Sequence, residues 1–312
     1  MQSSFNISKK IKPLTKEIAI QDYIKLTKMD LNNLKTESCI GNKFVDYFTF
    51  EERLNTISRK GMNYYEFLLD TDYHARPYIQ NLLVRQEKLL INMETKLYRI
   101  FTLHCGSVSI FKPLKALEVY NRFKPQHILD PCAGWGGRLV GACAAGVLNY
   151  TGIDCNANLK EPYLKMIDIL NELTNNQTSD HGLKGTPTKI QILFQDALLV
   201  DYSKIDYDMI FTSPPYYNIE LYSGTVKRSK QEWTDGFYKP LFSKVFEHLL
   251  VGGHMCINIS IEIYNEVFLK LFGAADIIIP MNIKARPTTS KAMKEFIYCW
   301  KKKAATAESG QL

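Results

Sequence analysis

Long apolar runs are missing from this chain of 312 residues, and no segment approaches the roughly 18 apolar residues that a membrane-spanning helix needs. The first residues carry no basic segment followed by an apolar stretch, so we expect no signal peptide. Internal repeats and low-complexity tracts are also missing. Apolar residues make up 46% and charged residues 23% of the chain, which excludes a disordered chain, a collagen-like fibre and a coiled coil. We therefore expect a globular, cytoplasmic protein without a membrane partner.

The seven cysteines lack the spacing of a metal site or of a disulfide framework. No two of them form a Cys-x-x-Cys pair, and their number is odd. Several lie among small or apolar residues, where a free cysteine behaves as a small apolar side chain. We expect neither a bound metal nor a network of disulfides.

The charge balance is mildly basic, because 39 Lys and Arg face 32 Asp and Glu, which gives a formal net charge of +7. Such an excess is compatible with a polyanionic partner, although many enzymes with small substrates have a similar charge. The length corresponds to about two domains of roughly 150 residues each. Composition therefore leaves the function open, whereas the order of motifs along the chain narrows it.

Residues 1–105 have a mostly helical pattern. Apolar residues recur every three or four positions from Pro77 to Leu97, which predicts one helix that begins at the proline. Further helices are expected at Ile18–Leu34 and Tyr64–Leu69. We expect this N-terminal helical region to recognise a target or a protein partner.

Residues 106–303 have a different pattern, in which short apolar runs alternate with helical segments. This alternation predicts an α/β fold with a parallel sheet covered on both faces. Only a loop separates the last two strands, so one of them is expected to run antiparallel at an edge. The predicted strands are Gln126–Asp130, Tyr150–Asp154, Lys189–Asp196, Tyr207–Thr212, His254–Ser260, Asp276–Ile283 and Glu295–Trp300. The predicted helices are Arg138–Ala145, Asn158–Leu173, Glu232–Leu250 and Glu262–Phe272, and residues 304–312 are expected to form a disordered tail.

A glycine-rich turn follows the first predicted strand, in the sequence Asp130-Pro131-Cys132-Ala133-Gly134-Trp135-Gly136-Gly137. Glycines there let the backbone approach a ligand closely and expose amide groups at a helix N-terminus. A dinucleotide-binding fold would have a third glycine where Leu139 stands. The Asp130 carboxylate would also sit badly beside a pyrophosphate, whereas it suits an ammonium or sulfonium group. The alternative is a tight strand-to-helix turn without a ligand.

Two further aspartates end the second and third predicted strands. Asp154 could accept hydrogen bonds from both hydroxyls of a ribose, as acidic residues do in other nucleoside-binding sheets. Asp196 could accept one from an adenine amino group. Either residue alone is more often a helix cap or a solvated strand end. Ligands of open α/β sheets bind at the carboxyl ends of the strands, so three acids on successive strand ends predict a binding site.

The fourth predicted strand runs into Thr212-Ser213-Pro214-Pro215-Tyr216. The two prolines fix the backbone and remove two donors, so that neighbouring carbonyl groups are rigidly directed. Acceptors held beside an aromatic face suit an amino group on a planar ring. Carbonyl groups or the Ser213 hydroxyl would accept its N–H bonds while Tyr216 stacks on the ring. The alternative is a proline turn that only ends the strand.

This series of motifs resembles an S-adenosylmethionine-dependent amino methyltransferase of DNA, and the resemblance runs from Ser107 to Lys303. Phe111-Lys112-Pro113 resembles the Lys-Pro segment beside the cofactor in such enzymes, and the run from Glu295 to Lys301 resembles their closing strand. The resemblance implies a Rossmann-like seven-stranded methyltransferase sheet and S-adenosylmethionine as cofactor. It implies cofactor-binding roles for Lys112, Asp130, Pro131, Ala133, Gly134, Gly136, Asp154 and Asp196, and catalytic roles for Ser213, Pro214, Pro215 and Tyr216.

Serine at the first position of the proline motif is similar to enzymes that act on N4 of cytosine, whereas Asp or Asn is commoner in enzymes of N6 of adenine. Methylation of carbon 5 would need a cysteine near Pro214, where none occurs. The resemblance implies direct in-line transfer to a flipped base without a covalent enzyme intermediate. Alternatives are an adenine-N6 enzyme, an RNA methyltransferase and an inactive cofactor-binding subunit.

Target recognition has few candidate segments, because only about a dozen residues follow the closing strand. Tyr217 and Tyr222 are candidates for stacking on a base, and Lys227 and Arg228 for binding phosphates of DNA or RNA. The N-terminal region or a protein partner could contribute the rest. Two further basic strips are Lys284, Arg286, Lys291 and Lys294, and Lys9, Lys10 and Lys12.

Overall fold

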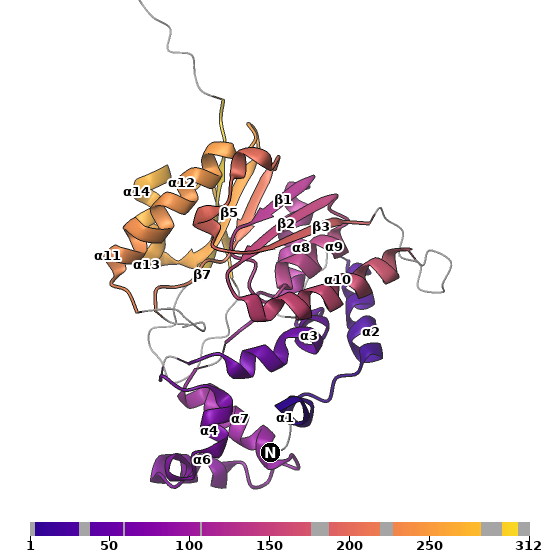
Figure 1. Cartoon of the computed structure of the whole chain (residues 1–312), viewed down its shortest axis with the longest axis vertical. Coiled ribbons are helices and arrows are strands. Elements are labelled where there is room, and N and C mark those ends of the chain that lie inside the picture. The colour runs from indigo at the N-terminus through magenta and orange to yellow at the C-terminus, as the bar shows by residue number, and fades with distance from the viewer. Residues whose placement is uncertain are drawn as a thin grey trace, which may run out of the picture.

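The computed structural model of the protein shows a layered α/β body with a group of helices at one end (Figure 1). The described residues are 4–30, 38–58, 60–106, 108–175, 187–218, 227–281 and 295–304. None of the helices in these ranges is long and apolar enough to cross a membrane.

A single sheet of seven strands forms the centre, in the order β3-β2-β1-β4-β5-β7-β6. The strands are β1 His127–Asp130, β2 Asn149–Asp154, β3 Lys189–Phe194, β4 Met209–Thr212, β5 His254–Ser260, β6 Ile277–Pro280 and β7 Glu295–Lys301. Each overlaps a strand predicted from the sequence, and the predicted Rossmann-like α/β class is confirmed. The expected edge position of the antiparallel strand is wrong. The antiparallel strand is β7, which lies between β5 and β6.

The register brings the functional motifs to one edge of the sheet. β1, β2, β3, β4 and β5 run parallel to one another, so their carboxyl ends meet there. Asp130 pairs with Gly152 of β2, and Thr212 at the end of β4 pairs with Ile257 of β5. The glycine turn and the proline motif therefore leave two neighbouring strands, β1 and β4, at the same edge.

Alternate residues of the central strands face two different cores. Ile128 packs with the helices α8, α9 and α10, whereas its neighbour Leu129 packs with the helical segments on the other face. The first set is α8 Pro113–Phe123, α9 Gly137–Ala145 and α10 Lys160–Asn175. The second set contains α11 Lys230–Trp233, α12 Lys239–His248, α13 Ile261–Ile263 and α14 Leu269–Phe272. Figure 1 shows the two sets on opposite sides of the sheet.

Two π-helical turns interrupt the second set. Thr234–Tyr238 joins α11 to α12, and Tyr264–Phe268 joins α13 to α14. The two turns pack together, with the rings of Tyr238 and Phe268 6.1 Å apart. π-helical turns are often found at functional sites, and both of these lie beside the segment that follows β4.

The N-terminal region is helical, as predicted, but the long helix expected from Pro77 to Leu97 is wrong. It is two helices, α6 and α7, because Asn92 caps the second by accepting a hydrogen bond from the Thr95 amide. The intervening Leu90 is fully exposed, so its apolar spacing did not indicate a helix. The elements are α1 Ser4–Ile11, α2 Lys16–Thr27, α3 Asn42–Asn55, α4 Tyr64–Leu69, α5 Thr71–His74, α6 Pro77–Arg85 and α7 Met93–His104.

The large core does not follow the boundary predicted at residue 105. Tyr23 and Leu26 of α2 and Phe44 of α3 belong to the same buried cluster as Leu139 of α9 and Met166 of α10. A smaller aromatic-rich cluster joins the end of α3 to α4, α5, α6 and α7. The first helices thus complete the core of the α/β body, and the separate division of residues 1–105 stays a prediction.

Candidate active site

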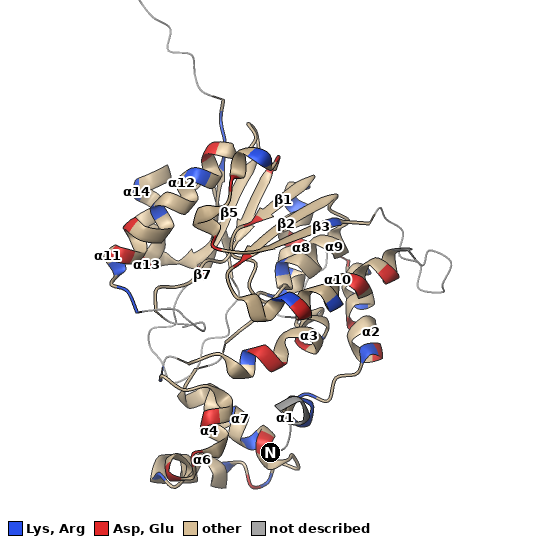
Figure 2. Cartoon of the chain, viewed as in Figure 1, with Lys and Arg blue, Asp and Glu red and all other residues tan. Residues whose placement is uncertain are grey.

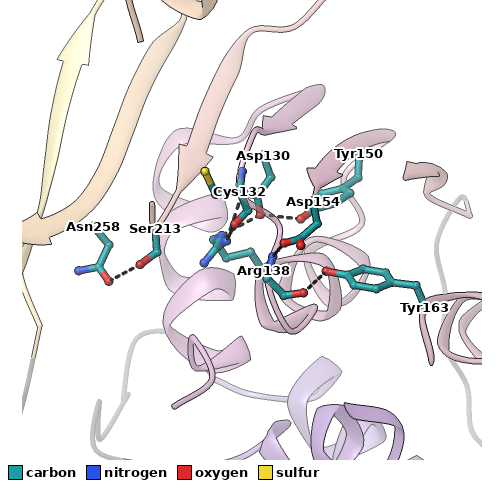
Figure 3. A network of polar contacts seen from close by, with 9 residues as sticks. Asp130, Cys132, Arg138, Tyr150, Asp154, Tyr163, Ser213 and Asn258 are labelled. Carbon is teal, nitrogen blue, oxygen red and sulfur yellow. Dashed lines mark hydrogen bonds and ion pairs between the residues drawn. The ribbon is translucent and has the colours of Figure 1, made fainter. Parts of the chain in front are cut away.

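Three of the predicted site residues, Asp130, Asp154 and Ser213, lie along the carboxyl edge of β1, β2 and β4 (Figure 3). The glycine turn leaves β1, Asp154 ends β2, and Ser213 follows β4. Ala133 within the turn is buried and donates its amide hydrogen bond to the Ile153 carbonyl of β2, 2.8 Å away. This bond ties the turn to the neighbouring strand, and Pro131 beside it is also buried.

The glycine turn needs its glycines for two different reasons. Gly134 and Gly136 have left-handed backbones, with φ of +58° and +85°. A Cβ on Gly134 would meet only the Cys132 carbonyl oxygen, at 3.9 Å, so the turn is open on that side. A Cβ on Gly137 would lie 1.9 Å from the Phe111 carbonyl oxygen, so here close packing requires glycine. The turn thus combines an open position at Gly134 with a tightly packed helix start at Gly137.

Asp130 is completely buried, and both of its carboxylate oxygens have partners. Arg138 of α9 donates from Nε to Oδ2 at 2.7 Å and from Nη2 to Oδ1 at 3.2 Å. The Tyr150 hydroxyl donates to Oδ2 at 2.7 Å. Burial lowers the pKa of Arg138, but the Asp130 carboxylate raises it more, so the guanidinium stays charged.

Asp130 was predicted to bind a cationic group of a ligand, but it already has a cationic partner within the protein. Arg138 already neutralises the carboxylate, and a second cation would have to share the same oxygens. The structure favours a structural role for Asp130. Its carboxylate binds Arg138, and Arg138 in turn binds the backbone of the glycine turn. Arg138 also donates to the Cys132 carbonyl and lies 5.3 Å from the ring centre of Phe111.

Asp154 is the strand-end acid that points into the turn. Its Oδ2 accepts a hydrogen bond from the Gly134 amide at 2.7 Å, and its Oδ1 accepts one from the Asn156 amide at 2.9 Å. Burial raises the pKa of Asp154 to about 6, and the two amides oppose this shift. Each oxygen retains a lone pair, which is what two hydroxyl donors on adjacent carbons would need.

Asp196 lies beyond the end of β3, since that strand stops at Phe194 rather than at Asp196 as predicted. Its side chain is exposed and caps a short 3₁₀ turn by accepting from the Leu198 amide at 2.9 Å. Capping was the alternative considered for this residue. The binding of an amino group by Asp196 stays a prediction.

Lys112 precedes α8 at the helix N-terminus, next to Pro113 in the first turn. Its neighbour Phe111 contacts the ring of Phe211 in β4, with ring centres 5.4 Å apart. The segment therefore lies against the glycine turn, as the Gly137 contact with Phe111 also requires. The backbone position agrees with a site beside the turn, whereas a cofactor contact by Lys112 stays a prediction.

The proline motif is held by a small network of hydrogen bonds after β4. The Ser213 hydroxyl donates to Asn258 Oδ1 of β5 at 3.3 Å, and the Tyr216 hydroxyl donates to the Asn258 carbonyl at 3.1 Å. Tyr238 donates to the Pro215 carbonyl at 2.5 Å. Burial raises the pKa of Tyr216 well above its usual value, helped by the Glu295 charge and opposed by a hydrogen bond with Ser213. Tyr216 is therefore a neutral hydrogen-bond donor.

Tyr217 is held away from solvent, which disagrees with its predicted role in stacking on a base. Its side chain is 9% exposed, and its backbone is left-handed with φ of +52°. Its amide donates to the Tyr238 hydroxyl at 3.2 Å, and its own hydroxyl donates to Glu266 at 3.1 Å. These partners come from the two π-helical turns. Tyr217 therefore fixes the exit from the proline motif, and a base could stack on it only after a rearrangement.

Lys227 and Arg228 are exposed where the chain enters α11, and Figure 2 shows basic residues at this position. Asn218 joins the two sides of the intervening segment. Its Oδ1 accepts from the Arg228 amide at 3.1 Å, and its Nδ2 donates to the Arg228 carbonyl at 2.6 Å. These bonds hold the Arg228 backbone beside Asn218, and the Arg228 guanidinium lies over the ring of Trp233, 5.4 Å from the ring centre.

The remaining candidates for nucleic-acid contacts are Tyr222 and the two further basic strips. Tyr222 and the strip Lys284, Arg286, Lys291 and Lys294 lie outside the described residues. Lys10 pairs with Glu94 at 2.6 Å, and Lys12 pairs with Asp46 at 2.5 Å. These two lysines are engaged within the N-terminal helices. In the described part of the chain, no group of three His, Cys, Asp or Glu could hold a metal ion.

The sequence did not single out Arg138, Asn258 or Tyr238, although all three hold the site together. Asn258 had a detectable signal, because it is a polar residue inside an otherwise apolar strand. Arg138 and Tyr238 had none, since basic and aromatic residues are ordinary in helices that cover a sheet.

No protein-family model and no curated protein matches the sequence, whereas solved structures match it at low identity. TehB from Haemophilus influenzae is 15% identical with a TM-score of 0.37, and the match covers 65% of this chain and 66% of TehB. An rRNA methylase from Streptococcus thermophilus is 12% identical with a TM-score of 0.38, covering 63% of this chain and 100% of that one.

RsmC from T. thermophilus, a 16S rRNA N2 G1207 methyltransferase solved in complex with AdoMet and guanosine, is 17% identical with a TM-score of 0.39. That match covers 64% of this chain and 45% of RsmC, so this chain spans less than half of that protein. These structures are similar to this chain in fold alone. Its membership of the seven-stranded Rossmann-like class rests on its own strand order, with an antiparallel β7 between β5 and β6.

Proposed function

We propose that this protein is an S-adenosylmethionine-dependent methyltransferase that modifies the exocyclic amine of a flipped base in DNA, with N4 of cytosine ahead of N6 of adenine. One observation carries the proposal. An open glycine turn with a strand-end carboxylate lies beside a rigid group of acceptors, and the two leave the neighbouring strands β1 and β4. This arrangement supports a proposed site for a nucleoside-containing cofactor next to a proposed site for an amine.

The residues of the turn fit the proposed cofactor. The open side at Gly134 gives room that a Cβ would fill, and Asp154 offers two acceptor oxygens for a ribose. Arg138 and Asp130 keep the turn rigid, and Lys112, Pro131, Ala133, Gly136 and Asp196 are proposed to line the same site. When bound, S-adenosylmethionine supplies an electrophilic methyl group on a positively charged sulfur.

The chain's part in the reaction is to hold the amine and to draw on its N–H bonds. Ser213 Oγ and the carbonyl groups around Pro214 and Pro215 are acceptors, and Tyr216 lines the ring. With S-adenosylmethionine bound, the amine would receive the methyl group in exchange for one of its protons, which would leave to solvent, while these residues would hold the amine in place and accept its N–H bonds. Alignment supplies most of the rate in such a transfer. The preference for cytosine rests on the resemblance alone, because serine stands at the first position of the proline motif.

The direct test is mass spectrometry of nucleosides from DNA and RNA of cells that express the intact protein or the Ser213→Ala variant. We expect N4-methylcytosine in DNA with the intact protein and a much smaller amount with the variant. Thr151→Val is a matched control, because it removes a buried hydrogen bond to His127 away from Ser213.

Other outcomes would change the proposal in defined ways. N6-methyladenine would keep the mechanism and overturn the choice of base, and a modified base in RNA alone would overturn DNA as substrate. No modified base in either nucleic acid, with the cofactor bound in a calorimetric titration, would favour the inactive subunit. Equal activity of the Ser213→Ala variant would contradict the catalytic assignment.

A further inference from the structure

Asn258 is a polar residue buried in the middle of an apolar strand. Asn258 is 3% exposed, and its neighbours Ile257 and Ile259 are completely buried. Burying an amide is unfavourable unless its polar atoms have hydrogen-bond partners. The partners of Asn258 therefore indicate why this strand tolerates it.

Both polar atoms of the Asn258 side chain and its backbone carbonyl have hydrogen-bond partners. Nδ2 donates to the Phe296 carbonyl of β7 at 3.2 Å, Oδ1 accepts from the Ser213 hydroxyl at 3.3 Å, and the backbone carbonyl accepts from the Tyr216 hydroxyl at 3.1 Å. A carbonyl oxygen can only accept, so the bond to Phe296 fixes which end of the amide faces Ser213. Figure 3 shows Oδ1 directed at that hydroxyl.

This orientation determines how the Ser213 hydroxyl can act. A serine hydroxyl has one proton to donate and two lone pairs that accept. The proton is directed at Asn258 Oδ1, because that amide oxygen can only accept. The lone pairs of Ser213 Oγ are left for a donor outside this pair, and an amine is such a donor.

We propose that Asn258 is a positioning residue that holds Ser213 as a hydrogen-bond acceptor toward the substrate amine. This inference rests on the proposed function. The Asn258 amide oxygen takes up the Ser213 proton in a hydrogen bond. Ser213 Oγ can therefore face the amine as an acceptor, as an ionised carboxylate oxygen would. The 3.3 Å contact is long for a hydroxyl donor, as is common before the substrate is bound.

A double-mutant cycle tests this role in the full-length protein. We would measure kcat and KM with unmethylated genomic DNA and radiolabelled S-adenosylmethionine for Ser213→Ala, Asn258→Ala and the double variant. We expect each single change to lower kcat by roughly tenfold to a hundredfold, with KM for S-adenosylmethionine unchanged. The double variant should be no slower than Ser213→Ala, since Asn258 acts through that hydroxyl.

Two further variants separate positioning from folding. Asn258→Asp keeps an acceptor for Ser213 but loses the donor to Phe296, so we expect it to restore most of kcat at neutral pH while its melting temperature stays below that of the intact protein. Thr151→Val, which changes a residue of equal burial elsewhere in the sheet, should lower the melting temperature without lowering kcat.

The results distinguish failure of this inference from failure of the proposed function. Multiplicative losses in the double variant, or an Asn258→Asp variant as slow as Asn258→Ala, would show that Asn258 only supports β5 and β7 and would overturn the inference. Full activity of Ser213→Ala would instead overturn the assignment of Ser213, and the proposed chemistry with it.

Discussion

Arg138 and Asp130 form a buried ion pair between the end of β1 and the first turn of α9. Removing one partner of such a pair leaves an uncompensated charge in the protein interior. We expect Arg138→Met to lower the free energy of unfolding by about 3–5 kcal/mol. Tyr150→Phe removes one hydrogen bond to the same carboxylate and should lower it by about 1.5–3 kcal/mol. Urea denaturation followed by circular dichroism measures both, and a larger loss for Tyr150→Phe would contradict the central place of Arg138.

If Asp154 binds the ribose as proposed, we expect binding of the cofactor to depend on pH. Burial raises its pKa to about 6, Asp130 adds to this rise, and the Asn156 and Gly134 amides and Arg138 oppose it. Hydroxyl groups of a ribose donate to the ionised carboxylate and therefore favour it. The affinity for S-adenosylmethionine should thus be highest above pH 6, where Asp154 is ionised. Below pH 6 the affinity should fall by up to about tenfold per pH unit.

Calorimetric titrations with S-adenosylmethionine between pH 5.5 and 8 test this dependence. The Asp154→Asn variant cannot ionise, so we expect it to bind more weakly at pH 8 and with little change between the two limits. A dependence on pH that is the same in both proteins would assign the titration to another group. Circular dichroism at each pH controls for unfolding.

At the scale of an element, the glycine turn is constrained most where the helix begins. An added methyl group at Gly137 would meet the Phe111 carbonyl oxygen at 1.9 Å, and backbone atoms yield less readily than side chains. We expect Gly137→Ala to lower the free energy of unfolding by at least about 1–3 kcal/mol. Gly236 has open space around its Cα, so Gly236→Ala should change stability by no more than about 1 kcal/mol, toward greater stability. Thermal melts of the two variants give the comparison.

The strands were the elements most readily predicted, because each combines an apolar run with a turn signal at its end. Predicted and observed bounds agree most closely at β5, whereas the strand predicted to end at Asp196 stops two residues earlier. Helix interruptions were not predicted. The π-helical turns leave the apolar period almost unchanged, and the break after α6 depended on the cap at Asn92 rather than on hydrophobicity.

The site was predictable in its order along the chain but not in its contacts. The motifs named Asp154 and Ser213, since each stands at a strand end. They could not show that Arg138 forms an ion pair with Asp130 or that Asn258 faces Ser213, because those contacts depend on how the strands and helices pack. Tyr217 illustrates the same limit, since nothing in its local sequence distinguishes an exposed aromatic ring from a buried one.

At the scale of the whole molecule, the N-terminal helices share a core with the sheet-covering helices. Buried residues of α2 and α3 pack with α9 and α10, so the core around the sheet includes residues from the N-terminal helices. We expect a chain of residues 106–312 to lack a cooperative thermal transition. A chain that lacks only residues 1–11 loses α1 and should keep one, at a lower temperature. Calorimetry of both truncations tests this, and a cooperative transition in the shorter chain would confirm the predicted boundary at residue 105.

The clasp between Asn218 and Arg228 has a consequence for how such a protein could acquire a new target. The two residues hold both ends of the intervening segment, with hydrogen bonds of 2.6 and 3.1 Å, independently of what lies between them. Lengthening a loop whose ends are fixed is inexpensive, at about 0.6 kcal/mol for each doubling. We therefore expect that residues between Asn218 and Arg228 can be replaced or added with these two hydrogen bonds kept, so that a new target specificity could be introduced by exchanging one short stretch of sequence.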